Sequence, residues 1–299
     1  RAKDISKILT DANISGTLTV TGDLASSTSG TSNFRAGVNA GDSIQSGGNY
    51  NVLIGDEAGQ AITTGDGNVA VGFEALTTED GHGKNVAIGY QALKTLNAGG
   101  DGSNTAVGYQ AGLSITTGSS LTLIGANAGD ALTIGNNNTA VGDFALSSEI
   151  AGDKNVAIGG GTLQHQSNSS DADAHNTAVG YRSGNAITTG LQNTLIGSLA
   201  GDALTDADYN VAMGMEALST DTLGSRSVAL GKGTLKNQNF TSATDSYNVA
   251  VGYEAGNDIT SGIQNTLIGG LAGEKLTDAD YNVAVGVAAL DLDTKGNKS

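Results

Sequence analysis

The chain of 299 residues is long enough for two ordinary domains, yet it has no Pro, Trp or Cys, contains 46 Gly and is only 4% aromatic. The absence of Cys excludes disulfides, thiolate nucleophiles and Cys-based metal sites, and the few aromatic residues favour a narrow core of Val, Ile, Leu and Ala over a compact globule. The net charge of −16 argues against nucleic acid as a partner, and because no apolar run approaches ~18 residues we expect no membrane insertion.

The first 32 residues are expected to form an N-terminal connector. Residues 1–11 have a helical pattern, with Ile5, Ile8 and Leu9 on one face. Residues 14–24, ISGTLTVTGDL, alternate with period 2 and have Gly at their corners, which predicts a short pair of strands.

From Asn33 onward the chain is a tandem repeat, and residues 33–299 are expected to form one repeat domain. The consensus is Asn, Thr or Val, Ala or Leu, Val or Ile, Gly, two variable residues, Ala, and Gly or Leu. Fifteen copies follow one another at a spacing of 17 residues, or 18 to 21 residues at four places, and the fifth position is Gly in every copy. The copies begin at Asn33, Asn51, Asn68, Asn85, Asn104, Leu121, Asn138, Asn155, Asn176, Asn193, Asn210, Ser227, Asn248, Asn265 and Asn282.

This period predicts an all-β fold, a parallel β-solenoid of about 15 coils. Each β-prone run ends at a Gly that can form a tight corner, and a second extended run such as AITTG in residues 61–65 ends at another Gly. A coil of two short strands and two corners cannot bury its own face, but stacked coils form continuous parallel sheets. At ~4.8 Å per coil the rod would be roughly 70 Å long. The recurring Asn either forms a ladder between coils or simply suits the turn.

The ninth position alternates between pairs of Gly coils and pairs of Leu coils, so the larger unit is a block of four coils. Gly coils carry Ile or Leu three residues later, whereas Leu coils mostly carry a polar residue there. This pattern conserves the volume of a packed core. The fourth block stops after three coils, so we expect the sequence to be part of a longer chain. The polar residues include Glu79, Glu149, Gln166, Asp221 and Gln238.

The third position of each copy is expected to face outward, because strand side chains alternate between faces and we place Val and Ile of the second and fourth positions inside. A regular apolar stripe of Ala and Leu along a rod would then mark an interface between identical chains. The alternative is a very thin core that takes the Ala inward. The expected interface of a homotrimer comprises Leu53, Ala70, Ala87, Ala106, Leu123, Ala140, Leu195 and Leu267.

The motifs NTAVGYQAG, NTLIG and NVAIGYQAL resemble the head repeats of trimeric autotransporter adhesins. They are even more similar to the repeats of bacteriophage tail fibres that precede an endosialidase-type self-cleaving intramolecular chaperone. The resemblance covers residues 33–290 and implies a left-handed parallel β-roll trimer. It also implies a virion or cell-surface location, and as partners a host-cell receptor or glycan and other fibre or baseplate proteins.

Catalytic, cofactor and metal sites are not expected. The three His residues, His82, His165 and His175, all lie in loops between coils. A metal site would need His165 and His175 to meet across a threefold axis, whereas as loop residues we expect them to be solvated. The acids of the two TDAD segments lack the GGxGxD pattern of calcium-binding repeats.

The insertions that lengthen some coils, residues 94–103, 164–175 and 236–247, are expected to protrude along one edge. Surface loops on a rigid scaffold tolerate binding variation. His165, Phe240 and Tyr247 are therefore the candidates for receptor contact, unless the loops are spacers on a shaft whose tip lies elsewhere.

These features favour a structural attachment fibre that is not an enzyme. A bacterial trimeric adhesin head is the nearest alternative. An ice-binding solenoid would need a regular Thr array, but the recurring Thr residues are interrupted in most Leu coils. A glycan-cleaving fibre would need a pair of carboxylates in a groove, and paired acids do not recur at such a position.

Overall fold

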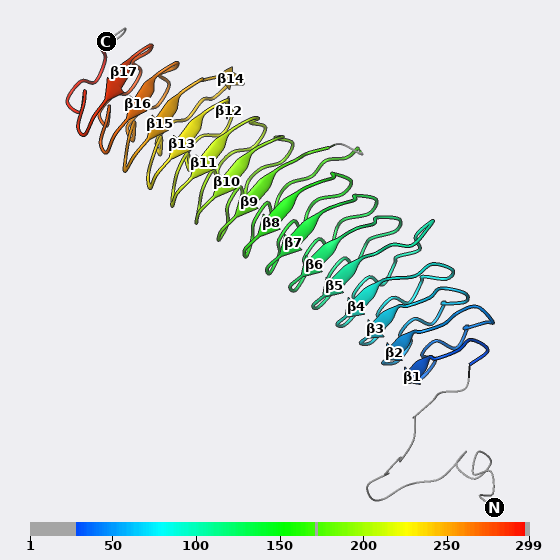
Figure 1. Ribbon diagram of the computed structural model, residues 1–299. Helices are drawn as coiled ribbons and strands as arrows, with labels where there is room; N and C mark the ends of the chain where they lie inside the picture. The colour runs from blue at the N-terminus through cyan, green and yellow to red at the C-terminus, as the bar shows by residue number, and fades with distance from the viewer. Residues whose placement is uncertain (1–27, 171–172, 297–299) are drawn as a thin grey trace, which may run out of the picture.

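The computed structural model describes residues 28–170 and 173–296. Within these residues the chain is all-β without a helix, and fifteen parallel strands stack in chain order into one sheet. Figure 1 shows the resulting coils following one another along an elongated rod. The expected all-β parallel solenoid of about 15 coils is confirmed. The expected helical segment and strand pair of the connector lie outside the described residues.

Each coil contributes one strand of three residues to the large sheet, and each strand is the NVAVG-like run of a repeat. Two further strands of two residues, β12 (Gly224–Ser225) and β14 (Thr244–Asp245), pair separately. The strands of the large sheet are β1 (Phe34–Ala36), β2 (Val52–Ile54), β3 (Val69–Val71), β4 (Val86–Ile88), β5 (Thr105–Val107), β6 (Thr122–Ile124), β7 (Thr139–Val141), β8 (Val156–Ile158), β9 (Thr177–Val179), β10 (Thr194–Ile196), β11 (Val211–Met213), β13 (Val228–Leu230), β15 (Val249–Val251), β16 (Thr266–Ile268) and β17 (Val283–Val285).

The second extended run of each coil does not form the second sheet that the repeat predicts. It is bent, and a few backbone hydrogen bonds join it to the next coil. The N–H of Thr116 donates to the carbonyl of Thr133 at 2.8 Å, and the N–H of Thr188 donates to that of Thr205 at 2.9 Å. A few such bonds per coil, including one from the N–H of Ser114 to the carbonyl of Asp130 at 3.0 Å, hold this side of the rod in register without a regular ladder.

The first-position Asn side chains are buried and form a ladder along the rod. The Oδ1 of Asn51 accepts the backbone N–H of Asn68 at 2.8 Å. Its Nδ2 donates to the carbonyl of Gly65, 14 residues further along the same coil, at 2.8 Å. Most of these Asn residues join two coils and also bond across their own coil, which confirms the ladder interpretation over a simple preference for turns.

The fifth-position Gly is required both by its backbone conformation and by the next coil. At Gly142 φ is +137°, a conformation that side chains other than Gly rarely adopt. A Cβ added there would lie 2.5 Å from the carbonyl oxygen of Gly159 in the following coil. The close stacking of coils thus leaves no room for a methyl group at this corner.

The third-position side chains point into the coil, so their assignment to a trimer interface is wrong. All eight expected interface residues are fully buried within a single chain: Leu53, Ala70, Ala87, Ala106, Leu123, Ala140, Leu195 and Leu267. The reason is the Asn ladder, since alternation along a strand places the third position on the same face as the buried first position. The second and fourth positions therefore face outward, and the thin core does take Ala inward.

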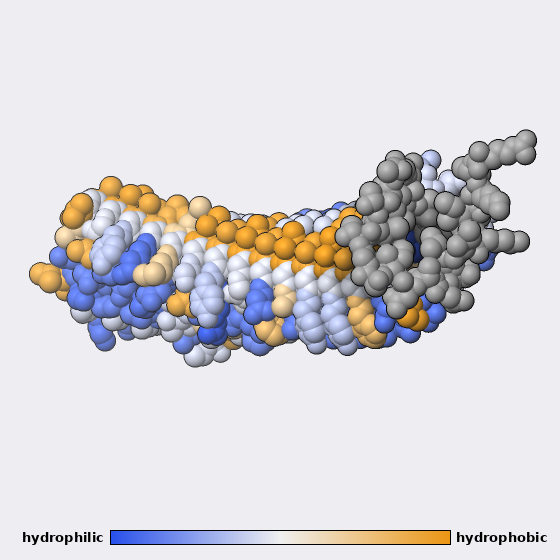
Figure 2. All heavy atoms as spheres, turned by 90° about the horizontal axis from the view of Figure 1, so that it is seen from below, coloured by the Kyte–Doolittle hydropathy of each residue, from blue (hydrophilic) through white to orange (hydrophobic). Residues whose placement is uncertain are grey.

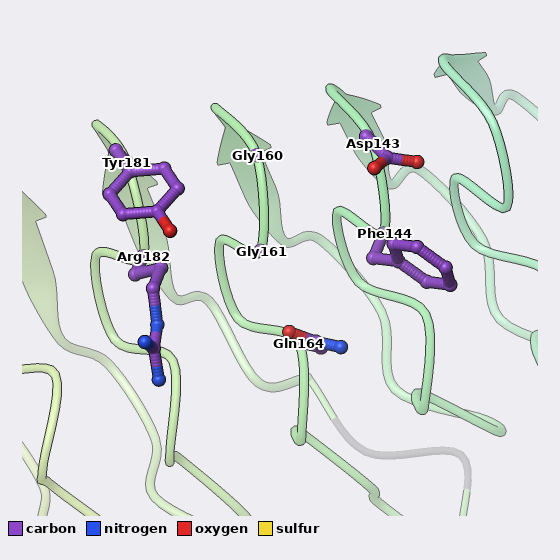
Figure 3. A pocket seen from close by; sticks show the side chains of 7 residues that line it. All are labelled: Asp143, Phe144, Gly160, Gly161, Gln164, Tyr181 and Arg182. Atoms are coloured by element: carbon purple, nitrogen blue, oxygen red, sulfur yellow. The ribbon is translucent and has the colours of Figure 1, made fainter.

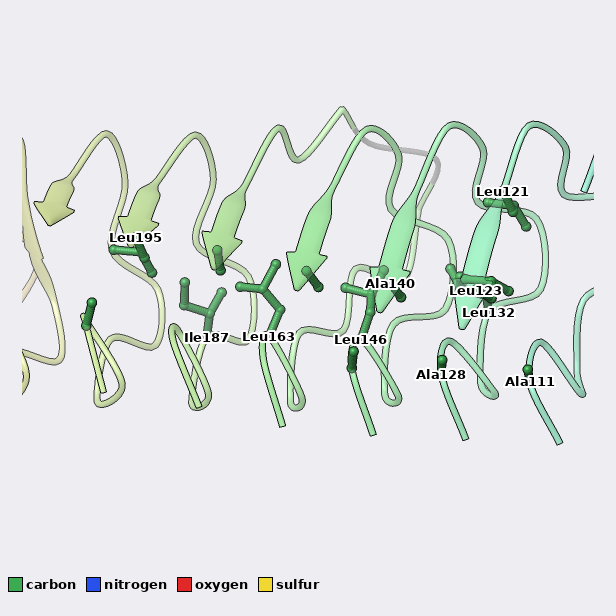
Figure 4. Packing of buried hydrophobic residues seen from close by; sticks show 14 of the residues in the cluster. Ala111, Leu121, Leu123, Ala128, Leu132, Ala140, Leu146, Leu163, Ile187 and Leu195 are labelled. Carbon is green, nitrogen blue, oxygen red and sulfur yellow. The ribbon is translucent and has the colours of Figure 1, made fainter. Parts of the chain in front are cut away.

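The core keeps its volume by shifting one large side chain between positions. Leu123 occupies the space that two neighbouring ninth-position glycines leave open. A Cβ on Gly112 would lie 2.8 Å from one methyl carbon of Leu123, and a Cβ on Gly129 would lie 2.9 Å from the other. Leu coils fill the same space from the ninth position, as Leu146 does in Figure 4. The side chain three residues later fills this space as well, since a Cβ on Gly112 would lie 2.7 Å from Ile115 and a Cβ on Gly129 would lie 2.9 Å from Leu132. The expected exchange between Leu at the ninth position and Ile or Leu three residues later is therefore confirmed.

Substitutions at two adjacent residues of β6 test which face of the strand is buried in the core. Leu123→Ala should lower the free energy of unfolding by about 2 to 5 kcal/mol, because it leaves a cavity in a closely packed core. Thr122→Ala, at a half-buried side chain on the outward face of the same strand, should cost less than about 1 kcal/mol. Urea denaturation followed by circular dichroism measures both, and equal losses would contradict the observed orientation.

Candidate interaction surface

The outward face of the large sheet carries a continuous row of apolar side chains, which we call the apolar stripe. Figure 2 shows a row of hydrophobic residues running along one face of the rod. The second-position Val and Thr side chains lie beside it and are mostly half-buried. Many of the stripe side chains are half-buried as well, and those of Ile88, Ile124 and Ile268 are about 40% exposed. The stripe consists of Ile54, Val71, Ile88, Val107, Ile124, Val141, Ile158, Val179, Ile196, Met213, Leu230, Val251, Ile268 and Val285.

An exposed aromatic column flanks the stripe on the side of the fifth-position Gly. The sixth-position rings of Phe73, Tyr90 and Tyr109 stack on one another, with 5.4 Å between the centroids of each adjacent pair. Their separation follows from the spacing of the coils, because side chains at equivalent positions of stacked coils lie about one strand spacing apart. The three residues are 43%, 43% and 52% exposed, so the column is open to solvent over three consecutive coils.

A second column flanks the stripe on its other side, at the residue that precedes the first-position Asn. The guanidinium of Arg226 lies 4.7 Å from the ring centroid of Tyr209 and 5.9 Å from that of Tyr247. The Nε of Arg226 also lies 3.0 Å from a carboxylate oxygen of Asp245. Cation–π contacts and this ion pair fix the positions of these side chains relative to one another.

Each inserted loop is fixed at its start by a buried carboxylate of the preceding coil. Oxygens of Glu79 and Glu149 accept the backbone N–H groups of Ala98 and Asn168 at 3.1 and 3.0 Å. Asp221 accepts the N–H of Phe240 at 3.1 Å. The three acids occupy one repeat position in the three complete blocks, so the loops leave the rod in the same way.

The three acids differ in how completely the surrounding chain satisfies them. Glu149 accepts four backbone N–H groups on Oε1 and the amide nitrogens of Gln166 and Asn168 on Oε2. Glu79 accepts the N–H groups of His82 and Ala98, and its coil is followed by Leu96 where the second block has Gln166. Burial raises the pKa of Glu79 above its ordinary value, because fewer hydrogen bonds offset the loss of solvation.

The three candidates for receptor contact end up in different surroundings. His165 is exposed and Tyr247 is 51% exposed. Phe240 is only 6% exposed, and its ring packs against the backbone at Gly224, so its assignment to a receptor-binding surface is wrong. Its apolar ring covers the base of the loop that Asp221 holds. Receptor contact by His165 and Tyr247 stays a prediction.

The polar clusters of the loops are engaged with neighbouring coils. Glu79, Asp80 and His82 bring ligand atoms within 4.8 Å of one another, but Glu79 already holds the loop backbone. In the TDAD segments, Asp208 and Asp280 accept the backbone N–H groups of Leu191 and Ile263 at 2.7 and 2.8 Å. These acids therefore tie successive coils together.

Sequence reasoning noted three acids only as polar residues of the Leu coils, and it missed both their burial and the outward stripe. The role of the acids could have been inferred from their recurrence, since Glu79, Glu149 and Asp221 stand at one repeat position at intervals of about one block. The stripe could have been found by assuming that the recurring Asn is buried. The third position then lies on the same inward face as the Asn, and the fourth position faces outward.

Comparisons of the chain with protein-family models, with curated proteins and with solved structures gave no match. In the part of the chain that the structure describes, no helix is long and apolar enough to span a bilayer.

Proposed function

We propose that the chain is a rigid shaft segment of a trimeric attachment fibre, of the kind that viral tails carry, and that it supports adhesion to a host-cell surface. The observation that carries the proposal is the apolar stripe, which runs along one face of a rod of near-identical coils. An exposed apolar row that long usually marks an interaction site. Identical chains that lie parallel to one another offer the stripe a partner of equal length and equal repeat.

The stripe replaces the Ala and Leu residues as the proposed interface. Three parallel chains around an axis along the rod would bring three stripes together and leave the charged and polar sides in solvent. The threefold number comes from the resemblance of the repeats to tail-fibre and adhesin-head repeats. A virion or a bacterial surface would both suit such a shaft, and other fibre or baseplate proteins would join its ends.

The recurring Thr hydroxyls favour the fibre over an ice-binding role. The Oγ1 atoms of Thr116 and Thr188 donate to the carbonyls of Thr133 and Thr205 in the following coil. Hydroxyls engaged in this way stabilise the stack of coils and offer fewer hydrogen bonds to a surrounding lattice.

Charges placed on the stripe should separate the chains. The double substitution Ile124→Glu and Ile158→Glu puts two carboxylates at side chains that are 40% and 38% exposed. Burying them against a partner would be strongly unfavourable, so sedimentation equilibrium should show monomers where the unmodified chain sediments as trimers.

The matched control is the double substitution Ile134→Glu and Ile150→Glu, at side chains that are 40% and 39% exposed but lie outside the stripe. It introduces the same charge and should leave the trimer intact. Trimers in both variants, or dissociation of both, would overturn the stripe as the interface.

A further inference from the structure

A notch interrupts the surface of the rod in the coil that begins at Asn155. In the repeat NVAIGGGTL the sixth and seventh positions are both Gly, at Gly160 and Gly161. Asp143 and Phe144 of the preceding coil line one side, and Tyr181 and Arg182 of the following coil line the other, with Gln164 below (Figure 3). The notch has a volume of about 280 Å³.

The notch arises because Gly160 has no side chain at the sixth position, where the corresponding coils of the other blocks have a large one. In the first block the corresponding coil carries Tyr90, which stacks 5.4 Å from each neighbouring ring. In the third block the corresponding residue is Lys232, whose Nζ lies 5.4 Å from the ring centroid of Tyr253. Where Gly160 stands, the flanking coils are two strand spacings apart, about 10 Å. This gap has the thickness of one inserted six-membered ring in contact with both sides.

The side chains around the gap combine ring surfaces with donors and acceptors. Phe144 and Tyr181 are 41% and 61% exposed, so their rings are available to a ligand. The Asp143 carboxylate is an acceptor, and the Arg182 guanidinium donates to Asn185 at 3.2 Å through one of its five N–H groups, which leaves others for a ligand. Gln164 accepts from Asn185 at 3.2 Å and adds an amide.

We propose that this notch binds a single neutral pyranose ring of a glycan. A pyranose has apolar C–H faces that pack against aromatic rings, and hydroxyls at its edge that both donate and accept hydrogen bonds. One acid and one guanidinium on opposite walls balance each other, so the site recognises a neutral ring. Apolar walls with a few convergent polar groups are the usual composition of a small-molecule site.

Ligand-observed NMR on the full chain tests the site. The probes are the methyl glycosides of glucose, galactose and N-acetylglucosamine, with benzamide as a flat aromatic comparison. At least one glycoside should bind with a dissociation constant on the order of 1 mM, as expected for one small ring in an open notch.

Gly160→Tyr fills the gap with the residue that the first block carries and should weaken that binding about tenfold or more. A Cβ on Gly160 meets no atom closer than 3.9 Å, so the fold should accept it. The matched control is Gly270→Tyr, at the same repeat position of another coil and in open surroundings, and it should leave binding unchanged. Should circular dichroism show that Gly160→Tyr has lost the solenoid, Tyr181→Ala takes its place with the same expected loss.

No binding by any glycoside, unchanged binding to Gly160→Tyr, or binding of benzamide alone would each overturn the inference. The glycan site gives the proposed attachment role a ligand class, and it rests on that role only for its biological use.

Sedimentation of the same sample distinguishes failure of the glycan site from failure of the trimer. A trimer that binds no glycoside overturns the site alone, and a monomer that binds a glycoside overturns the trimer alone.

Discussion

Gly142→Ala should disrupt the rod around its seventh coil. The added Cβ would lie 2.5 Å from the carbonyl oxygen and 2.6 Å from the carbonyl carbon of Gly159, and φ of +137° is itself strained for Ala. Neither coil can move away without breaking hydrogen bonds to its other neighbour. We expect a loss of more than about 3 kcal/mol in the local free energy of opening, measured as hydrogen exchange about 100-fold faster at the amides of β7 and β8.

Gly286→Ala is the control for the conformational part of that effect. Gly286 has a similar φ of +130°, but a Cβ there meets nothing within 4 Å. Its cost should be limited to backbone strain in the last described coil, with exchange in β7 and β8 unchanged. A Gly142→Ala chain as protected in β7 and β8 as the unmodified chain would contradict the close stacking of coils.

Glu149→Ala should release the inserted loop of the second block. The N–H groups of Ile150, Gly152 and Asn168 and two side-chain amides would lose their acceptor in a buried setting. Removing one partner from a buried charged network costs about 3 to 5 kcal/mol. The urea midpoint of unfolding should fall. The rate of limited proteolysis within residues 164–175 should rise.

Asp143→Ala in the same coil removes the same charge from the surface. The Asp143 carboxylate is exposed and accepts no hydrogen bond from the described residues, so its loss should change stability by less than about 0.5 kcal/mol. Equal effects of the two substitutions would mean that charge, and not the buried hydrogen bonds, governs stability here.

The repeat period and its invariant Gly were sufficient to predict the solenoid. Fifteen glycines at the fifth position leave few other folds open, because each marks a corner that only Gly forms without strain. The order of the sheet follows directly, since each coil of a solenoid contacts only the coils before and after it.

The facing of the strands could not be predicted from hydrophobicity alone. Val69 and Val71 are larger than Ala70 and were therefore placed inside, yet burying Asn68 in the ladder turns Ala70 inward. A polar side chain is normally a surface signal, and here its hydrogen bonds across and along the rod outweigh its polarity. The same reasoning hid Glu149, whose six acceptor contacts come from residues up to 19 positions away.

The notch could be recognised only after the fold was known. Gly160 and Gly161 follow another Gly in the sequence and look like further corner residues. Their meaning depends on Asp143 and Tyr181, which belong to the coils on either side and lie 17 and 21 residues away.

The molar mass of the chain in dilute solution tests the fibre proposal most directly. Sedimentation equilibrium of the unmodified protein should give three times the chain mass of 29.6 kDa, with no dependence on speed or loading concentration in the micromolar range. A mass of one chain under these conditions would mean that the apolar stripe is not an interface between copies and would contradict the account.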